Sequence, residues 1–187
     1  MTIGFNHLGR HGRLGNQMFQ YAGLRGIAAH RGFDFMIPES DFNDEWNDHQ
    51  LFEAFKLKGL TNIGVCPGPY VQEAHFHFDQ NLYDNMPDGH NVYAYLQSTK
   101  YFDIIEEDIR QDFEFKNEIK APCEDMISTV QDPIALHVRR GDYIQNCDNH
   151  PPCPKEYYDT ALSKFDNRRT VVIFSDDPQW CSTEFPD

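Results

Sequence analysis

Two adjacent arginines, Arg139 and Arg140, stand directly after a short apolar run over 134–138 and are followed by Gly141 and Asp142. Such a run predicts a strand buried on both faces, and Gly141 allows a sharp turn at its end. Ligands of open α/β sheets bind at the carboxyl ends of the strands. The two guanidinium groups are therefore candidates for holding an anion, and their fork geometry suits a diphosphate. The alternative is that both arginines form surface ion pairs with the many acidic residues of the chain.

A second charged turn, Ser175, Asp176 and Asp177, follows a β-branched and apolar run over 170–174. A helix is predicted over 155–165, between the two runs, so the sequence predicts one βαβ unit with both charged turns at the same edge. A carboxylate such as that of Asp176 can accept hydrogen bonds from the N1–H and N2–H2 groups of guanine. The alternative is a helix N-cap in which the helix dipole favours the acidic side chains.

A glycine-punctuated loop over 9–15 contains Arg13 and leads into a helix predicted over 16–31, with Asn16 as its N-cap. The loop has neither the ending of a Walker loop nor the glycine spacing of dinucleotide-binding folds. It brings arginines and free backbone N–H groups to a helix N-terminus, and this combination predicts an anion site.

The composition limits the classes of partner. The chain has 187 residues, of which 16 are basic and 30 acidic, and its formal net charge is −14. This excess of acid argues against general binding to nucleic acid or to an anionic membrane. Residues 1–33 contain four arginines and no acidic residue, which suggests a small anionic ligand met at one place.

Cysteine usage and targeting signals bear on the compartment. Five cysteines are present, and neither a signal-peptide pattern nor an apolar run of roughly 20 residues is seen, so we expect reduced thiols in a cytoplasmic protein. Cys147, His150 and Cys153 lack a fourth ligand at zinc-finger spacing, and no metal is expected.

Other segments supply the elements that would position these groups. The patterns predict strands over 2–5, 33–37 and 92–96, helices over 50–58 and 101–113, an acidic surface loop over 39–50 and a turn-rich connection over 83–91. The segment 74–79 places His75, His77 and Asp79 on one face, which indicates a half-buried strand with solvated histidines rather than a metal or catalytic face. A charged segment over 116–122 ends in a proline and marks a domain boundary, so domains are expected over 1–120 and 121–187.

Four motifs, over 12–22, 95–102, 137–143 and 174–181, occur in an order that is specific as a set. The set resembles the alpha-1,2-fucosyltransferases of glycosyltransferase family 11, and the resemblance covers nearly the whole chain. It implies an α/β fold of the GT-B type, with two facing Rossmann-like domains and the active site between them. It also implies inverting transfer of L-fucose from GDP-β-L-fucose to the 2-hydroxyl of a galactose-terminated glycan, without a cofactor or metal.

The resemblance also implies roles for single residues in the donor site. Arg139 would hold the β-phosphate and neutralise the departing GDP, and Arg140 would support it. His137 would lie against the nucleotide, and Asp176 would recognise guanine.

Further roles concern the first domain and the proton. Arg13 and Asn16 would reach from the first domain toward the phosphate or the fucose. The general base for the acceptor hydroxyl is not identified by the resemblance. Asp142 is within sequence reach of that role, and it is equally suited to orienting the arginines.

Members of the family continue beyond the point that corresponds to Asp187, so the second domain is expected to be incomplete. Two strands with helices near 124–131 and 155–165 would leave an apolar edge and face uncovered. The chain would then self-associate, bind a second chain or fold loosely in its second half, with residues 1–113 better ordered. The alternative function is a catalytically inactive remnant that binds a nucleotide sugar or a glycan.

Overall fold

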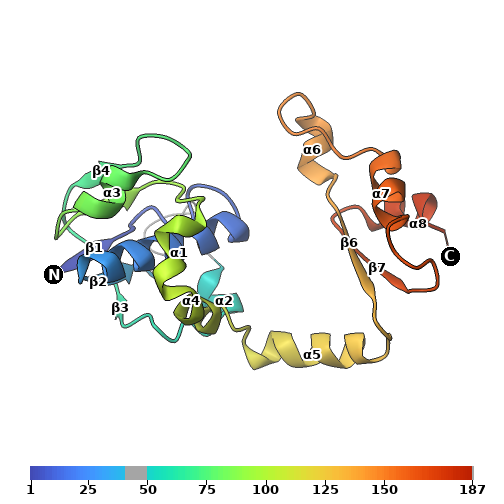
Figure 1. Ribbon diagram of the computed structural model, residues 1–187, viewed down its shortest axis with the longest axis horizontal. Coiled ribbons are helices and arrows are strands. Elements are labelled where there is room, and N and C mark those ends of the chain that lie inside the picture. The colour runs from blue at the N-terminus through green and yellow to red at the C-terminus, as the bar shows by residue number, and fades with distance from the viewer. Residues whose placement is uncertain (41–49, 187) are drawn as a thin grey trace. The chain divides into compact units, whose positions relative to one another are not determined.

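Two separate parallel sheets are formed by the residues that the computed structural model describes, 1–40 and 50–186 (Figure 1). The chain divides into unit 1, Met1–Lys120, and unit 2, Ala121–Asp187, and each unit has its own sheet and its own hydrophobic core. The acidic loop expected over 39–50 lies almost entirely outside the described residues.

Unit 1 is built around a five-stranded sheet in which neighbouring strands are parallel. Its strands are β1 (Thr2–Gly4), β2 (Asp34–Ile37), β3 (Asn62–Ile63), β4 (Tyr70–Gln72) and β5 (Asn91–Tyr93). They lie in the order β3-β2-β1-β5-β4. The order reverses between β1 and β5, so the loops that leave these two strands diverge at the carboxyl edge, where ligands of such sheets bind.

The helix α1 (Leu14–Arg31) carries the side chains that fill most of one side of the core, with Tyr21, Leu24 and Ile27 fully buried. A Cβ placed at Gly26 would lie 1.9 Å from the carbonyl oxygen of Tyr101, so only glycine permits this close approach. The helix ends at Gly32, whose left-handed backbone (φ 68°) lets its N–H bond the carbonyls at the helix end, as predicted.

Asn16 is not the N-cap of α1, as the sequence had suggested. The helix begins two residues earlier, with Arg13 at the N-cap, and Leu14 packs against the core from the first helical position. Asn16 therefore lies in the first turn, where its side chain is free to bond a partner from another segment.

Two predicted helices are shorter than the sequence pattern indicated. The helix expected over 50–58 forms only α2 (Leu51–Ala54), because Phe55 leaves the helix to form an antiparallel bridge with Phe115. The helix expected over 101–113 begins as two 3-10 turns and becomes α-helical only at its end: Thr99–Tyr101, Asp103–Ile105 and α4 (Glu106–Asp112).

The segment 74–79 is not a strand, so the alternation of its histidines does not mark a half-buried face. Asp79 instead caps the helix α3 (Gln80–Asn85), because its carboxylate accepts from the backbone N–H of Leu82 at 3.0 Å. Helix α3 occupies the first part of the segment that was expected to be a turn-rich connection.

Unit 2 contains the parallel pair β6 (Ile134–Val138) and β7 (Val171–Ser175), and the predicted strand–helix–strand unit is confirmed. The helices that accompany the pair are α6 (Gly141–Gln145), α7 (Lys155–Leu162) and α8 (Pro178–Glu184). Tyr158 of α7 and Cys181 of α8 pack against Leu136 and Val138 of β6.

Only one face of the β6–β7 pair is covered, and the prediction of strands buried on both faces is wrong. Burial alternates along β6, with Ala135 and His137 exposed, and Phe174 of β7 is 53% exposed. Helices α7 and α8 both pack on the opposite face, so nothing among the described residues covers this one.

The helix α5 (Asn117–Ser128) runs through the segment where the boundary was expected. Pro122 lies inside it instead of ending the charged segment, and none of its side chains is buried. Within the described part of the chain, no helix has the length and apolar character needed to cross a membrane.

Candidate active site

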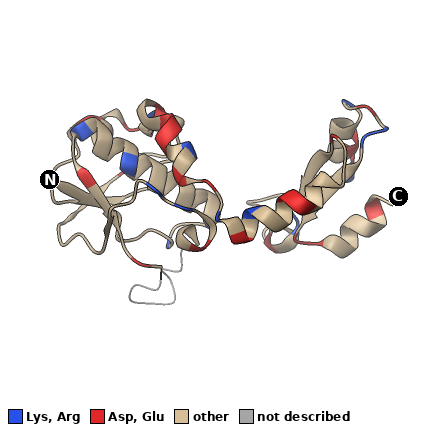
Figure 2. Ribbon diagram, turned by 90° about the horizontal axis from the view of Figure 1, so that it is seen from below, with Lys and Arg blue, Asp and Glu red and all other residues tan. Residues whose placement is uncertain are grey.

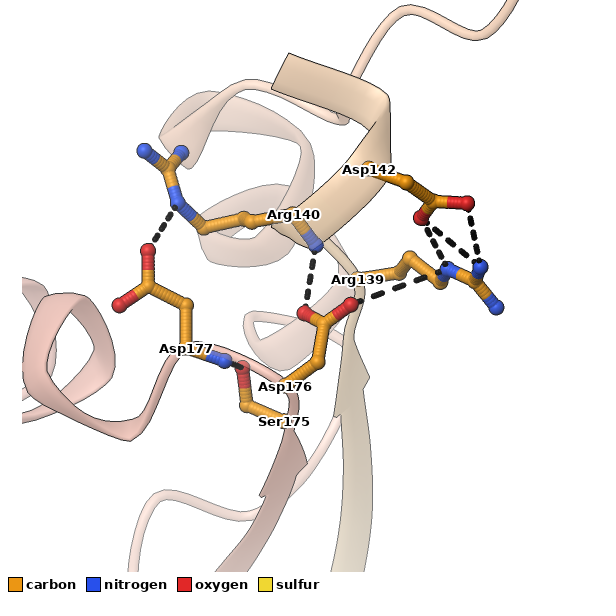
Figure 3. A network of polar contacts seen from close by, with 6 residues as sticks. All are labelled: Arg139, Arg140, Asp142, Ser175, Asp176 and Asp177. Carbon is orange, nitrogen blue, oxygen red and sulfur yellow. Dashed lines mark hydrogen bonds and ion pairs between the residues drawn. The ribbon is translucent and has the colours of Figure 1, made fainter. Parts of the chain in front are cut away.

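The carboxyl ends of β6 and β7 bring together most of the charged residues singled out in unit 2. The register pairs Val138 with Ser175, so the turn that begins at Arg139 lies level with the turn that begins at Asp176. Figure 3 shows these turns facing each other, with Arg139, Arg140 and three aspartates between them.

Arg139 is held by carboxylates and remains partly accessible. Its Nη2 donates to both oxygens of Asp142, at 2.8 and 3.0 Å, and its Nε lies 3.8 Å from Asp176. The guanidinium also lies over the ring of Tyr143, 4.9 Å from its centre. The side chain is 35% exposed, so one part of its fork is open to a ligand.

Arg140 is less exposed than Arg139 and is held by contacts to α8. Its Nε donates to Asp177 at 3.1 Å, its guanidinium stacks over the Trp180 ring at 4.0 Å, and its side chain is 20% exposed. Figure 3 shows that the two guanidinium groups point in opposite directions. The arginines are therefore paired with aspartates, which is the alternative left open by the sequence, and they do not converge on one point.

Asp176 connects the two strand ends. One of its oxygens accepts the backbone N–H of Arg140 at 2.8 Å, and this hydrogen bond, with help from the Gly141 amide, lowers the pKa of the Asp176 carboxyl. A Cβ at Gly141 would lie 2.7 Å from the other oxygen of Asp176, so glycine is needed at this contact. Asp176 thus has a structural role that any contact with guanine would have to share.

The N-cap that the sequence left as an alternative is present, but at the next residue. Asp177 caps α8 by accepting from the backbone N–H of Trp180 at 3.1 Å, and it also holds Arg140. Its own N–H donates to the hydroxyl of Ser175. The turn 175–177 is therefore a braced element and not a loose loop.

His137 lies on the uncovered face of β6. Its register partner is Phe174 of β7, so an imidazole and an exposed aromatic ring stand next to each other one residue before the charged turns. Both side chains are accessible on this face.

Arg13 and Asn16 belong to unit 1. The Arg13 side chain is exposed and forms no hydrogen bond or ion pair with the described residues, whereas the Arg13 carbonyl accepts the backbone N–H of Gln17. Asn16 accepts a hydrogen bond from Nε2 of Gln97, so the motif over 12–22 meets the motif over 95–102. Gly12 (φ 92°) packs so closely on Asn16 that a Cβ would overlap the amide group.

The arginine cluster in residues 1–33 is not a single positive patch. Arg25 pairs with Asp112 and donates to the carbonyl of Asp108, and Arg31 donates to the carbonyl of Met86. Figure 2 shows basic residues interspersed with acidic ones in both units. Two of the four arginines therefore bond groups within unit 1 and stabilise its structure.

Two residues that organise this edge of unit 1, Glu73 and Gln97, were not among the site residues predicted from the sequence. Gln97 lies inside the motif over 95–102, and that motif could have indicated it. Glu73 has no local signal, because it acts on residues more than 20 positions away: its buried carboxylate accepts from the backbone N–H groups of Tyr95 and Leu96.

Among residues 1–40 and 50–186, no three His, Cys, Asp or Glu side chains gather as they would to hold a metal ion. His75 and His77 stack in parallel at 3.5 Å, and Nδ1 of His75 lies 2.8 Å from the His77 carbonyl oxygen. His150, which the sequence placed near two cysteines, stacks instead on Tyr143.

Comparison with known proteins relates the chain to glycosyltransferases. An alpha-1,2-colitosyltransferase of Escherichia coli is 24% identical over 91% of this chain and 68% of its own length. The galactoside 2-alpha-L-fucosyltransferase Sec1 of Mus musculus is 26% identical over 91% of this chain and 49% of its own length. The chain therefore spans about two thirds of the first relative and about half of the second.

The fold is also similar to a solved structure, the fucosyltransferase NodZ from Bradyrhizobium, with a TM-score of 0.58 and 15% identity. The match covers 100% of this chain and 77% of NodZ, and it shows a shared α/β fold with parallel sheets. The family model of glycosyl transferase family 11 matches residues 2–187. The chain belongs to glycosyl transferase family 11.

Proposed function

We propose that the chain takes part in the transfer of L-fucose from GDP-β-L-fucose to the 2-hydroxyl of a galactoside, with inversion at the anomeric carbon. Family membership supports a glycosyltransferase. The names of the relatives, alpha-1,2-colitosyltransferase and galactoside 2-alpha-L-fucosyltransferase, support the linkage and the sugar class. NodZ, whose fold is similar, has been crystallised with GDP and soaked with GDP-fucose.

The observation that carries the proposal is the position of Arg139 and Arg140 at the carboxyl end of β6. When the acceptor oxygen attacks C1 of fucose, the bond between C1 and the phosphate oxygen breaks and negative charge develops on the β-phosphate. A guanidinium placed there stabilises that charge, which is commonly the largest contribution to such a reaction.

The geometry assigns different parts to the two arginines. Arg139 is the more exposed, and its main partner is Asp142 in the same turn, so a phosphate can replace that carboxylate by a side-chain movement. Arg140 is stacked and paired on α8, and its part is to hold the turn. Asp142 would then orient Arg139 before the donor binds.

The remaining assignments belong to the same proposal. His137, on the open face of β6, would lie against the nucleotide, and Asp176 would recognise guanine with the oxygen that does not hold the Arg140 amide. Arg13 and Asn16 of unit 1 would contact the phosphate or the fucose. No metal is required in this scheme, because the Arg139 guanidinium supplies the positive charge at the phosphate.

The test is a transfer assay with the full chain, GDP-fucose and lactose, read both as GDP release and as fucosylated product. GDP-colitose is run beside GDP-fucose, since one relative is named for that sugar. We expect product, retained in the presence of EDTA and lost in Arg139→Ala. Arg168→Ala is the matched control, because Arg168 is 86% exposed in unit 2 and pairs only locally with Asp166.

The second candidate is a nucleotide-sugar or glycan-binding module without activity. The observation that favours it is the pairing of both arginines with three aspartates, which leaves this group of five side chains with a net charge of about −1. Binding of GDP or lactose without GDP release from GDP-fucose would establish this candidate, and release with product would exclude it.

A further inference from the structure

A pocket of about 310 Å³ lies at the carboxyl edge of the sheet of unit 1, outside the charged turns described above. Its walls include the rings of His11, His75, Phe76, Tyr93 and Tyr95. These rings come from the end of β5, at Tyr93, and from the segments that follow β1, β4 and β5, so the pocket lies where the order of the strands reverses. The size is that of a small-molecule site rather than of a packing defect.

The rings form a connected wall. His11 meets Tyr93 edge-on with 4.8 Å between ring centres, and Tyr95 lies 5.7 Å from His11 and 5.6 Å from Phe76. Phe76 is 76% exposed, so most of its ring surface can be reached from solvent. The pocket thus offers accessible ring faces to a ligand.

His11 adds a polar group without a partner. Its Nε2 is buried and forms no hydrogen bond with the described residues, although the side chain of Gln20 fixes the backbone by donating to the His11 carbonyl at 2.9 Å. Burial, and secondly the charge of Arg10, lower the pKa of His11, so the ring is neutral at pH 7. A buried polar atom without a partner is unfavourable, and a hydrogen bond from a ligand in the pocket would satisfy it.

The shape of the pocket is held from beneath by Glu73. One oxygen of its carboxylate accepts from the N–H of Tyr95 at 3.0 Å and of Leu96 at 3.3 Å, and the other accepts from the hydroxyl of Tyr101 at 2.9 Å. Leu96 has a positive φ of 53°, a strained conformation that this clamp maintains. The wall at Tyr95 is therefore built before any ligand arrives.

We propose that this pocket binds one pyranose ring of the galactoside acceptor, stacked on Phe76 and Tyr95. Sugars present apolar C–H faces and a rim of hydroxyls, which matches a wall of aromatic rings with a few polar groups. Among the described residues that line the pocket, the one acidic side chain is that of Glu73, which is occupied by three hydrogen bonds. The described lining contains no lysine or arginine, so it offers no counter-ion to a charged ligand. This inference rests on the function proposed above, because it assigns the acceptor of that reaction.

The test measures equilibrium binding and does not depend on turnover. Lactose and, separately, GDP are titrated into the full chain and into Phe76→Ala and Tyr95→Ala, with binding followed by ligand-observed NMR. We expect each variant to weaken lactose by about tenfold or more and to leave GDP affinity unchanged. Phe165→Ala is the matched control, since Phe165 is 47% exposed and belongs to unit 2.

Phe76→Ala is expected to fold because the side chain is mostly exposed, and the thermal midpoint of each variant checks this. Unchanged lactose affinity in both variants, absence of saturable lactose binding, or loss of GDP affinity in place of lactose affinity would each overturn the inference. Transfer activity of the parent chain, together with unchanged lactose affinity in both variants, would support the proposed function and refute acceptor binding in this pocket. Lactose binding that depends on Phe76 without any transfer would do the reverse.

Discussion

Replacing Arg139 or Arg140 by alanine should separate ligand binding from stability. Arg139 is 35% exposed and bonded mainly within its own turn, whereas Arg140 is 20% exposed, paired with Asp177 and stacked on Trp180. Loss of a charge-assisted contact to phosphate costs about 2–3 kcal/mol. We therefore expect Arg139→Ala to weaken GDP by about 30- to 150-fold.

The expected loss of folding stability has the opposite order, and it is larger for Arg140→Ala than for Arg139→Ala. Arg140→Ala removes a cation–π contact worth about 0.5–2 kcal/mol and an ion pair worth about 0–1 kcal/mol, so we expect a loss of about 1–2 kcal/mol in the free energy of unfolding. Arg139→Ala removes only an exposed pair within one turn, worth about 0–1 kcal/mol.

Two measurements on the same variants test this pattern. GDP binding is measured by titration calorimetry, and unfolding in urea is followed by the fluorescence of Trp180 with Trp46 replaced by Phe throughout. Arg168→Ala should change neither quantity. The assignment would be refuted if Arg140→Ala lost at least as much GDP affinity as Arg139→Ala while keeping the urea midpoint of the parent.

Three further perturbations address other contacts. Asp176→Ala should weaken GDP much more than ADP, because adenine lacks the N1–H and N2–H2 donors; equal losses would show that Asp176 only ties the strand ends. Burial alone would raise the pKa of Asp79, but its backbone amide hydrogen bonds outweigh burial and lower it. The ionised Asp79 carboxylate therefore stabilises the fold above the ordinary aspartate pKa, and this stabilisation is lost as pH falls through the lowered value. Between about pH 6 and pH 3, Asp79→Asn should lose less free energy of unfolding than the parent does, as measured by urea titrations. Gly26→Ala should destabilise by about 1–3 kcal/mol in urea unfolding, because its Cβ would press on the Tyr101 carbonyl, whereas Gly15→Ala, with open space at its Cβ, should not.

Elements whose signal is local were the ones that the sequence predicted well. The strands β6 and β7 and the end of α1 at Gly32 follow from apolar runs and from a glycine in a left-handed conformation, and both are seen. The start of α1 was missed because an N-cap at Asn16 and a helix that begins at Leu14 have nearly the same sequence signature, and packing of Leu14 decides between them.

Features that depend on contacts between distant segments could not be read from the sequence. Nothing near Glu73 indicates that its carboxylate holds the backbone of Tyr95 and Leu96. Likewise, the sequence shows the charges of Arg139 and Arg140 but not their opposite directions. These follow from their partners, which are Asp142 in the same turn for Arg139 and Asp177 beyond the neighbouring strand for Arg140. The residue types of a site can be read from the sequence, whereas its geometry depends on contacts between segments that are distant in the chain.

The reversal of strand order in unit 1 has a consequence for protein engineering. The residues that hold the sheet together, such as Ile3 and Val92, lie within the strands and are fully buried, whereas the rings that line the pocket lie on or beyond the strand ends. A library that varies only Phe76 and Tyr95, and spares Glu73 beneath them, would explore new ligand preferences with little loss of folded protein. Stability and specificity are thus encoded by different positions of the same short strands and loops, and they can be changed independently.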